Sequence, residues 1–166
     1  MKKIVLISLV YILSVTAFAQ TSATINNPNI TIQFKRCIVV SNTAYLDFLI
    51  INNLGYDFSM HAYCQNFDNH EDSIAYDDEG NSYRVNAKKG LVACTLGSVT
   101  HLMTSLNGRS ETIPNGIPIK GRLEIGGVDS YATVFPLVKL QVSTSLEPYN
   151  RHFRTIEFRN VPITRE

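Results

Sequence analysis

Apolar and polar residues alternate along most of the chain after residue 29, as they do in half-buried β-strands. Apolar side chains occupy the even positions of residues 30–34, and the apolar parity then moves to Cys37 and Val39. Because successive side chains point to opposite faces of a strand, this change of parity predicts a β-bulge near Lys35 and Arg36.

Turn residues divide the rest of the chain into further short segments of this kind. Residues 77–81 combine acids with Gly80 and Asn81, which accept positive φ at low cost, so they predict a tight hairpin turn. Residues 88–107 have a mixed pattern that leaves room for a short helix. The remaining segments give roughly seven to nine strands and predict an all-β fold, an antiparallel β-sandwich over residues 30–163. These segments are 45–51, 58–64, 74–76, 83–85, 117–125, 134–142 and 151–159.

The parity within each segment also predicts which side chains face the core. Asp47 lies on the opposite face from its apolar neighbours, and His61, opposite Met60, is expected to be exposed. The residues expected inside are Leu46, Phe48, Ile50, Leu123, Ile125, Leu140, Ile156 and Phe158.

Four of the segments resemble a known group of domains. They are residues 45–53 (YLDFLIINN), 74–83 (IAYDDEGNSY), 117–125 (IPIKGRLEI) and 156–163 (IEFRNVPI). In order and spacing they resemble the telokin-like, immunoglobulin-like domains found in many secreted bacterial proteins of unassigned function. The resemblance implies an immunoglobulin-like sandwich with a role in recognition, and it supplies no catalytic residues.

Residues 1–19 have the three parts of a secretory signal peptide. The start is basic, residues 4–15 are mainly apolar, and Ala17 and Ala19 are the small residues that signal peptidase recognises. The apolar run is shorter than the roughly 20 residues that a membrane span needs. We therefore expect a mature chain that begins at Gln20 with a flexible lead at residues 20–29. The protein is predicted to be secreted or periplasmic, without a stable membrane span after cleavage.

Composition and charge narrow the choice of class further. The chain is 45% hydrophobic and 17% charged with a net charge of +1, which excludes a disordered chain. Residues 37–83 contain eight acids and no Lys or Arg, whereas eleven bases and six acids follow from Arg84 onward. This asymmetry either makes a dipolar surface that steers partners, or places opposite charges on neighbouring strands, where they pair across the sheet. The bases are too dilute to indicate nucleic-acid binding.

The three cysteines leave two arrangements open. In an oxidising compartment one disulfide and one free thiol are expected, and Cys64 with Cys94 forms a plausible loop-closing pair. Alternatively, Cys37, Cys64 and Cys94 are three buried thiols, since free cysteine packs as a small hydrophobic residue. No C-x-x-C motif indicates a redox or zinc site.

No motif indicates a catalytic centre or a cofactor. His61, His70, His101 and His152 lack the spacing of metal ligands, and no Gly-x-Ser-x-Gly elbow is present. A Ser-His-Asp triad forms only in space, so a hydrolase stays a remote alternative. The acidic residues 68–79 offer oxygen ligands to calcium. However, residues 77–81 are too short for an EF-hand loop, and we expect a turn there instead. We predict no catalytic residue, no metal ligand and no cofactor.

The sequence therefore favours a non-catalytic binding module for a cell-envelope protein or glycan. A second hypothesis is a structural or assembly component that pairs with its partner through an edge strand. An exposed apolar patch or a bare edge strand would favour interaction, and a cleft with clustered titratable groups would favour an enzyme.

Overall fold

A computed structural model describes residues 20–63, 72–85, 89–103, 109–145 and 151–166 of the chain. Within these residues the fold is all-β, and two sheets pack face to face as a sandwich. The all-β sandwich is thus confirmed. The described part has thirteen strands, so the expected seven to nine is too low. Several strands have only two to four residues, which is too short for an alternating pattern to be recognised.

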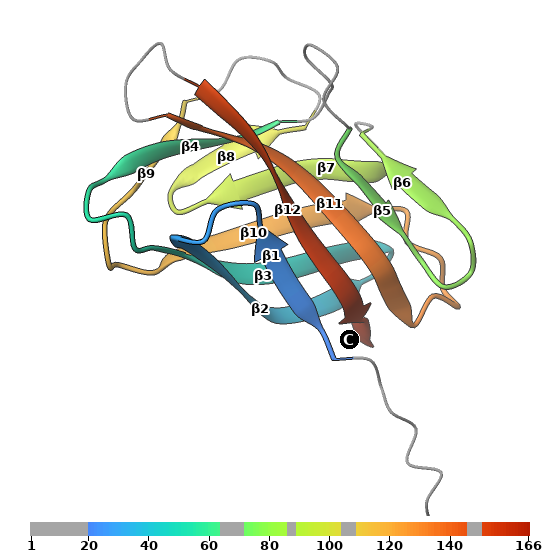
Figure 1. Cartoon of the computed structure of the whole chain (residues 1–166). Helices are drawn as coiled ribbons and strands as arrows, with labels where there is room; N and C mark the ends of the chain where they lie inside the picture. Colours follow the sequence, from blue (N-terminus) through green and yellow to red (C-terminus); the bar gives the residue numbers. More distant parts are fainter. Residues whose placement is uncertain (1–19, 64–71, 86–88, 104–108, 146–150) are drawn as a thin grey trace, which may run out of the picture.

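One sheet has seven strands and is built around the two longest strands of the protein. Its order is β1-β12-β11-β4-β9, and β5 also pairs with β11 and carries β6 at its other edge. Figure 1 shows β11 and β12 crossing diagonally over the other sheet. The strands are β1 (Ser22–Ile25), β4 (Phe58–Tyr63), β5 (Ile74–Tyr76), β6 (Ser82–Arg84), β9 (Glu111–Ile113), β11 (Val134–Ser145) and β12 (Arg151–Pro162).

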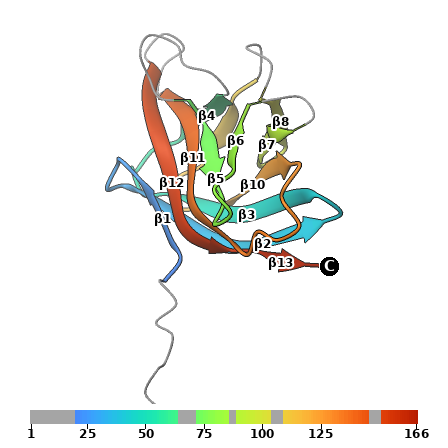
Figure 2. The same cartoon turned by 90° about the vertical axis from the view of Figure 1, so that its right-hand side faces the viewer.

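The other sheet has six strands in the order β13-β2-β3-β10-β7-β8. Its pairs are antiparallel except for the short parallel pair of β13 with β2. Figure 2 shows the two sheets as layers, with β2 and β3 in one layer and β11 and β12 in the other. The strands are β2 (Ile30–Val40), β3 (Thr43–Asn52), β7 (Gly90–Leu96), β8 (Val99–Leu102), β10 (Ile119–Gly126) and β13 (Thr164–Arg165).

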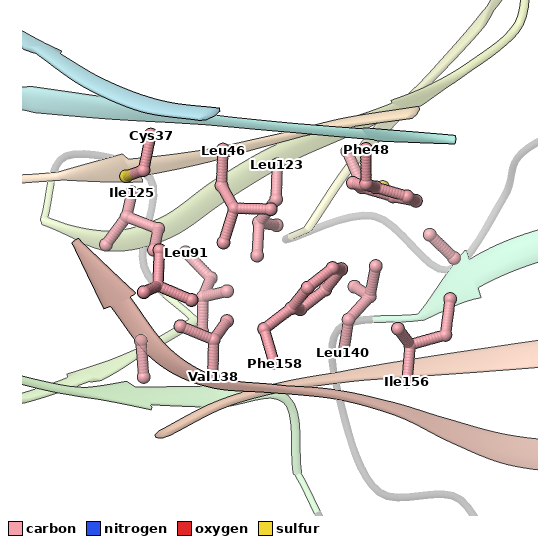
Figure 3. Close-up of a cluster of buried hydrophobic side chains, with 14 of the residues drawn as sticks. Cys37, Leu46, Phe48, Leu91, Leu123, Ile125, Val138, Leu140, Ile156 and Phe158 are labelled. Atoms are coloured by element: carbon pink, nitrogen blue, oxygen red, sulfur yellow. The ribbon is translucent and has the colours of Figure 1, made fainter. Parts of the chain in front are cut away.

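The core fills the space between the sheets. All eight side chains predicted to face inward are at most 1% exposed, which confirms the predicted register of their strands. Phe48 of β3 and Phe158 of β12 meet across the interface, with ring centroids 5.2 Å apart (Figure 3). Burial of these apolar side chains is the main force that holds the two layers together.

The predicted β-bulge in β2 is also confirmed. The register with β3 shifts between Phe34 and Arg36, so that Lys35 is the extra residue. Phe34 pairs with Phe48, and Arg36 pairs with Asp47. Both sides of the bulge therefore keep their apolar residues on the core face.

Three expectations need correction. Residues 20–29 are not simply a flexible lead, because Ser22–Ile25 pair with β12, and Thr164–Arg165 extend the sandwich beyond residue 163. His61 was expected to be exposed but is only 6% exposed. Alternation predicts which face of the strand a side chain lies on, but not whether another part of the protein covers that face. The described part of residues 88–107 forms strands β7 and β8 instead of a helix.

The predicted signal peptide, residues 1–19, lies outside the described residues. Among the residues that are described, no helix has the length and apolar character needed to cross a membrane.

Candidate functional site

A groove lies on the outer face of the six-stranded sheet, over β2, β3, β10 and β7. Its volume is about 610 Å³, compared with about 310 Å³ and 120 Å³ for two other hollows in the described part of the protein. We call it the basic groove, because its charged lining comprises Lys35, Arg36, Asp47, Lys120, Arg122 and Glu124.

The bulge in β2 supplies two of these bases. In a regular strand, consecutive side chains point to opposite faces, so Lys35 or Arg36 would face the core. Here both are exposed and both line the groove, because the extra residue re-aims the strand. The parity change in the sequence therefore has a consequence for the surface as well as for the core.

Asp47 on the central strand β3 joins the two arginines. It lies directly opposite Arg36 on β2 and Arg122 on β10. Arg122 donates from Nε to Asp47 Oδ1 at 2.6 Å and from Nη2 to Oδ2 at 3.0 Å. Arg36 donates from Nε to the same Oδ2 at 2.9 Å. Burial alone would raise the pKa of Asp47. The hydrogen bonds and charges of Arg122 and Arg36 outweigh that effect and lower the pKa below 3.8.

Arg122 is held from a second side by an aromatic ring. Its guanidinium carbon lies 5.5 Å from the centroid of Tyr45, within the range of a cation–π contact. The side chain is nevertheless 45% exposed, and that of Arg36 is 60% exposed. Arg122 is thus fixed in direction but still open to a ligand.

The two lysines carry charge that no acid of the described structure neutralises. Lys35 Nζ donates to the neutral amide oxygen of Gln33 at 3.3 Å. Lys120 is exposed and forms no ion pair with any described residue. With Asp47 already bound by two arginines, the groove has an excess of positive charge.

Below the groove, a glycine makes room for the core. Gly121 of β10 is the direct partner of Phe48, and a Cβ at Gly121 would lie 2.3 Å from that ring. No side chain other than hydrogen fits at this position without displacing Phe48. The ring therefore packs closely against the backbone of β10, and the charged groups of the groove lie above a tightly packed core.

Two acids of the acidic half of the sequence form ion pairs with bases of the basic half. Asp47, from the acidic half, pairs with Arg122 from the basic half, and Asp72 likewise pairs with Arg84 at 3.5 Å. This supports the second of the two interpretations, opposite charges on neighbouring strands.

The acidic residues 77–81 form the predicted hairpin turn between β5 and β6. Asp77 Oδ1 accepts hydrogen bonds from the backbone N–H groups of Glu79 and Asn81, at 3.1 and 2.8 Å. Its Oδ2 accepts from the Asn81 side chain at 2.9 Å and from the Tyr83 hydroxyl at 2.6 Å. Both oxygens of this carboxylate thus serve as acceptors within the turn.

Asp78 fastens the same turn to the start of β11. Its carboxylate accepts hydrogen bonds from the backbone and hydroxyl of Thr133 and from the backbone of Val134. Burial would raise the pKa of Asp78, but these donors lower it below 3.8. The described residues contain no group of three or more His, Cys, Asp or Glu that is placed to hold a metal ion.

Cys37 and Cys94 are buried, and neither forms a disulfide with another described residue. Burial raises the pKa of Cys37 to about 12 and also raises that of Cys94, so neither is a thiolate near neutral pH. Cys64 lies outside the described residues, and its pairing with Cys94 stays a prediction for a thiol assay to decide.

Two histidines meet at the side of the sandwich where β4 and β8 approach each other. The rings of His61 and His101 are edge to face, with centroids 4.3 Å apart. Neither ring nitrogen of His101 has a hydrogen-bond partner in the described structure. Burial, with a smaller contribution from His61, lowers the pKa of His101 to about 4. His152 is exposed on β12, and His70 lies outside the described residues.

Comparison with known proteins adds no relative: no family model, no curated protein and no solved structure matches this chain. The resemblance to telokin-like domains therefore stays a prediction. Sequence reasoning named no residue of the basic groove as a binding residue. The available signal was the parity change at Lys35 and Arg36, together with Asp47 on the outward face of its strand.

Proposed function

We propose that the protein is a non-catalytic interaction module that acts outside the cytoplasm and binds a cell-envelope protein or glycan. The observation that carries the proposal is the basic groove, which is a hollow of about 610 Å³ on the outer face of the six-stranded sheet. Ligand sites are typically concave and hold a few polar groups in fixed positions. Residues 1–19 have the pattern of a signal peptide, which supports a role in the cell envelope or beyond it.

The chemistry of the groove favours binding over catalysis. Its central groups, Arg36, Asp47 and Arg122, are joined in an ion-paired network, and the pKa of Asp47 is held low. A general acid or base needs a pKa near the working pH, which this network opposes. The same network fixes side chains in the geometry that recognition requires.

The test is to fill the groove. Leu49 is half-buried, faces outward between Gln33 and Lys120, and lines the groove, so Leu49→Trp would place a large side chain in it. The matched control is Leu137→Trp, which fills the hollow of about 310 Å³ on the other sheet.

The expected result is that purified protein captures a specific component of the envelope fraction and that Leu49→Trp loses it while Leu137→Trp keeps it. Equal capture by both variants would show that the basic groove is not the binding site. Calorimetry of each variant with the captured component separates direct from indirect binding.

A second candidate, assembly through an edge strand, is favoured by the position of β8. This strand is last in the six-stranded sheet (Figure 2). Leu102 on β8 is 58% exposed. A two-residue turn joins β7 to β8, and Leu96 pairs with Val99 beside it. In such a hairpin, hydrogen-bonded pairs alternate, so the backbone groups of Thr100 and Leu102 point away from β7. No described strand pairs with that side of β8.

Proline at Thr100 distinguishes this candidate from the groove. Thr100→Pro removes an outward N–H without removing a backbone bond to β7. It also removes the side-chain bond between Thr100 and Thr95 at 3.0 Å, which Thr100→Val removes as well while keeping the N–H, so Thr100→Val is the matched control. Loss of an envelope partner in Thr100→Pro but not in Leu49→Trp would identify edge pairing as the binding mode, because strand addition depends on backbone donors and acceptors. Circular dichroism checks that the variant retains its strand content.

A further inference from the structure

The charges of the basic groove identify the chemical class of its ligand. We infer that the groove binds an acidic glycan, a polysaccharide that bears carboxylate or sulfate groups, and that Lys35 and Lys120 contact these groups. This inference rests on the proposed binding function and makes it specific.

The excess of positive charge has a defined location. Four bases and two acids line the groove, and Asp47 is already bound by two arginines. Lys35 bonds only to a neutral amide, and Lys120 has no ion pair among the described residues. Glu124 is the second carboxylate of the lining, and neither lysine is paired with it. An anionic group in the groove would therefore find two ammonium groups that form no ion pair with a described residue.

The two lysines stand on either side of β3. Lys120 is the direct partner of Leu49 on β10, whereas Lys35 is the extra residue of the bulge on β2, beside the pair of Phe34 with Phe48. Strands two apart in a sheet are separated by about 10 Å. A chain that lies across the strands can thus place one acidic group near each lysine.

The polar lining favours a glycan over a protein segment. Protein interfaces depend on aromatic or aliphatic anchors that enter apolar pockets. In the groove, Leu49 is the one outward-facing aliphatic side chain, and it is half-buried, while the ring of Tyr45 is covered by Arg122. The remaining groups are hydrogen-bond donors and acceptors, such as Thr95, Glu124 and the two arginines, which suit the hydroxyl groups of sugars.

Nucleic acid fits this surface less well. Single strands bind where bases stack on exposed aromatic rings, and duplexes bind where many Lys and Arg contact phosphates. The groove has no free ring, and its four bases are accompanied by two acids.

The experiment measures binding of purified protein to three polymers at low salt: polygalacturonate, dextran sulfate and neutral dextran. The expected result is binding to one or both acidic polymers and not to dextran, with weaker binding as salt is raised. The two acidic polymers show whether carboxylate or sulfate is preferred. Lys35→Gln and Lys120→Gln should each weaken binding by about fivefold, the upper range for one exposed ion pair.

The control is Arg159→Gln, which removes the same charge from the outer face of the other sheet, where Arg159 pairs with Glu157 at 2.9 Å. It should leave affinity within about twofold, as expected for a surface charge away from the site. If all three variants weaken binding equally, the acidic polymer binds through diffuse charge, and the inference is wrong.

Other outcomes separate the inference from the proposed function. If dextran binds and Leu49→Trp abolishes that binding, the groove is a glycan site, but the acidic class is wrong. If no polymer binds while Leu49→Trp abolishes capture of an envelope protein, the inference fails and the proposed function stands. If Leu49→Trp affects no ligand at all, both fail.

Discussion

Two aspartates, Asp47 in the basic groove and Asp77 in the β5–β6 hairpin, show how the same side chain serves two purposes. Asp77 is 4% exposed and accepts from neutral donors, two backbone N–H groups, an amide and the Tyr83 hydroxyl. Asp47 accepts from two exposed arginines. Neutral donors that lie in the chain's own turn satisfy a carboxylate and fix the fold. Two arginines paired with one carboxylate leave a net positive charge, which is available to a ligand.

Each aspartate also has a buried aromatic residue close to it. Phe48 follows Asp47 on β3 and points into the core, 1% exposed. Tyr83, 2% exposed, donates to Asp77 and accepts from the backbone N–H of Asp129, so that it links the hairpin to the loop before β11. The aromatic residue below the groove, Phe48, contributes through packing, whereas Tyr83 beside the hairpin contributes through packing and through hydrogen bonds.

The largest expected effect is that of Phe48→Ala. The ring contacts Phe158 and covers Gly121, so its removal leaves a cavity between the sheets. We expect a loss of about 3–5 kcal/mol in the free energy of unfolding, measured by denaturant titration. The neighbouring variant Asp47→Ala is the control for the strand, with an expected loss of about 1 kcal/mol or less. Equal losses would contradict the register of β3.

The next effect compares the two aspartates directly. Asp77→Ala leaves the buried Tyr83 hydroxyl and the turn N–H groups without their acceptor, and we expect a loss of about 2–3 kcal/mol. Asp47→Ala frees two arginines that water can solvate, so it should cost less stability. In contrast, it should alter binding to the acidic polymers, while Asp77→Ala should not. The same denaturant and binding measurements decide both points. A larger loss of stability in Asp47→Ala than in Asp77→Ala would contradict the distinction between the two aspartates.

The response to acid distinguishes the hairpin from another buried polar group, His101, whose ring nitrogens have no hydrogen-bond partner among the described residues. In the folded state the pKa of His101 is lowered from 6.5 to about 4, so the unfolded chain takes up a proton first as the pH falls. Stability is then complete above pH 6.5 and declines between pH 6.5 and about 4. Burial would raise the pKa of Asp77, but its hydrogen-bond donors lower it, and its contribution is lost only below about pH 3.8.

Thermal unfolding across this pH range tests the assignment. His101→Leu should reduce the decline between pH 6.5 and 4 and should cost little at pH 7, since replacing an unpartnered polar group by an apolar one is close to neutral. An unchanged decline in His101→Leu would mean that another group is responsible.

Local patterns in the sequence carried much of the fold. The shared parity of Leu46, Phe48 and Ile50 predicted the burial of Phe48, and the parity change near Lys35 predicted the bulge, because both depend only on neighbours in the chain. β8 was missed, since four residues are too few to show a period. His61 was expected to be exposed because alternation defines a face and does not show what packs on it.

The groove was beyond such reasoning for a different reason. Its centre joins Asp47 to Arg122, which is 75 residues away, and the two meet only because β10 pairs with β3. Strand order in a sheet depends on non-local packing, and the alternating pattern of β10 fits many neighbours equally well. Sequence could therefore place Asp47 on the outer face but could not supply its partners.

The smallest expected effect is that of calcium on the hairpin. Because eight acids lie between residues 37 and 83, calcium binding is the strongest alternative to the interpretation of residues 77–81 as a simple turn. Calcium requires several oxygen ligands. To use Asp77, it would have to displace the N–H groups of Glu79 and Asn81 and the hydroxyl of Tyr83. Those donors belong to the turn itself, so the ion would have to break the fold that presents the carboxylate.

We therefore expect the melting temperature to stay unchanged when calcium chloride or EDTA is added. A site that is filled to 100 times its dissociation constant would stabilise the protein by about 2.7 kcal/mol. That stabilisation would raise the melting temperature of a protein of this size by roughly 5–11 °C. Asp78→Asn is the matched variant, because a real site would lose its response to calcium in it. A calcium-dependent rise that Asp78→Asn abolishes would show that the hairpin binds a ligand, and the contrast between the two aspartates would fail.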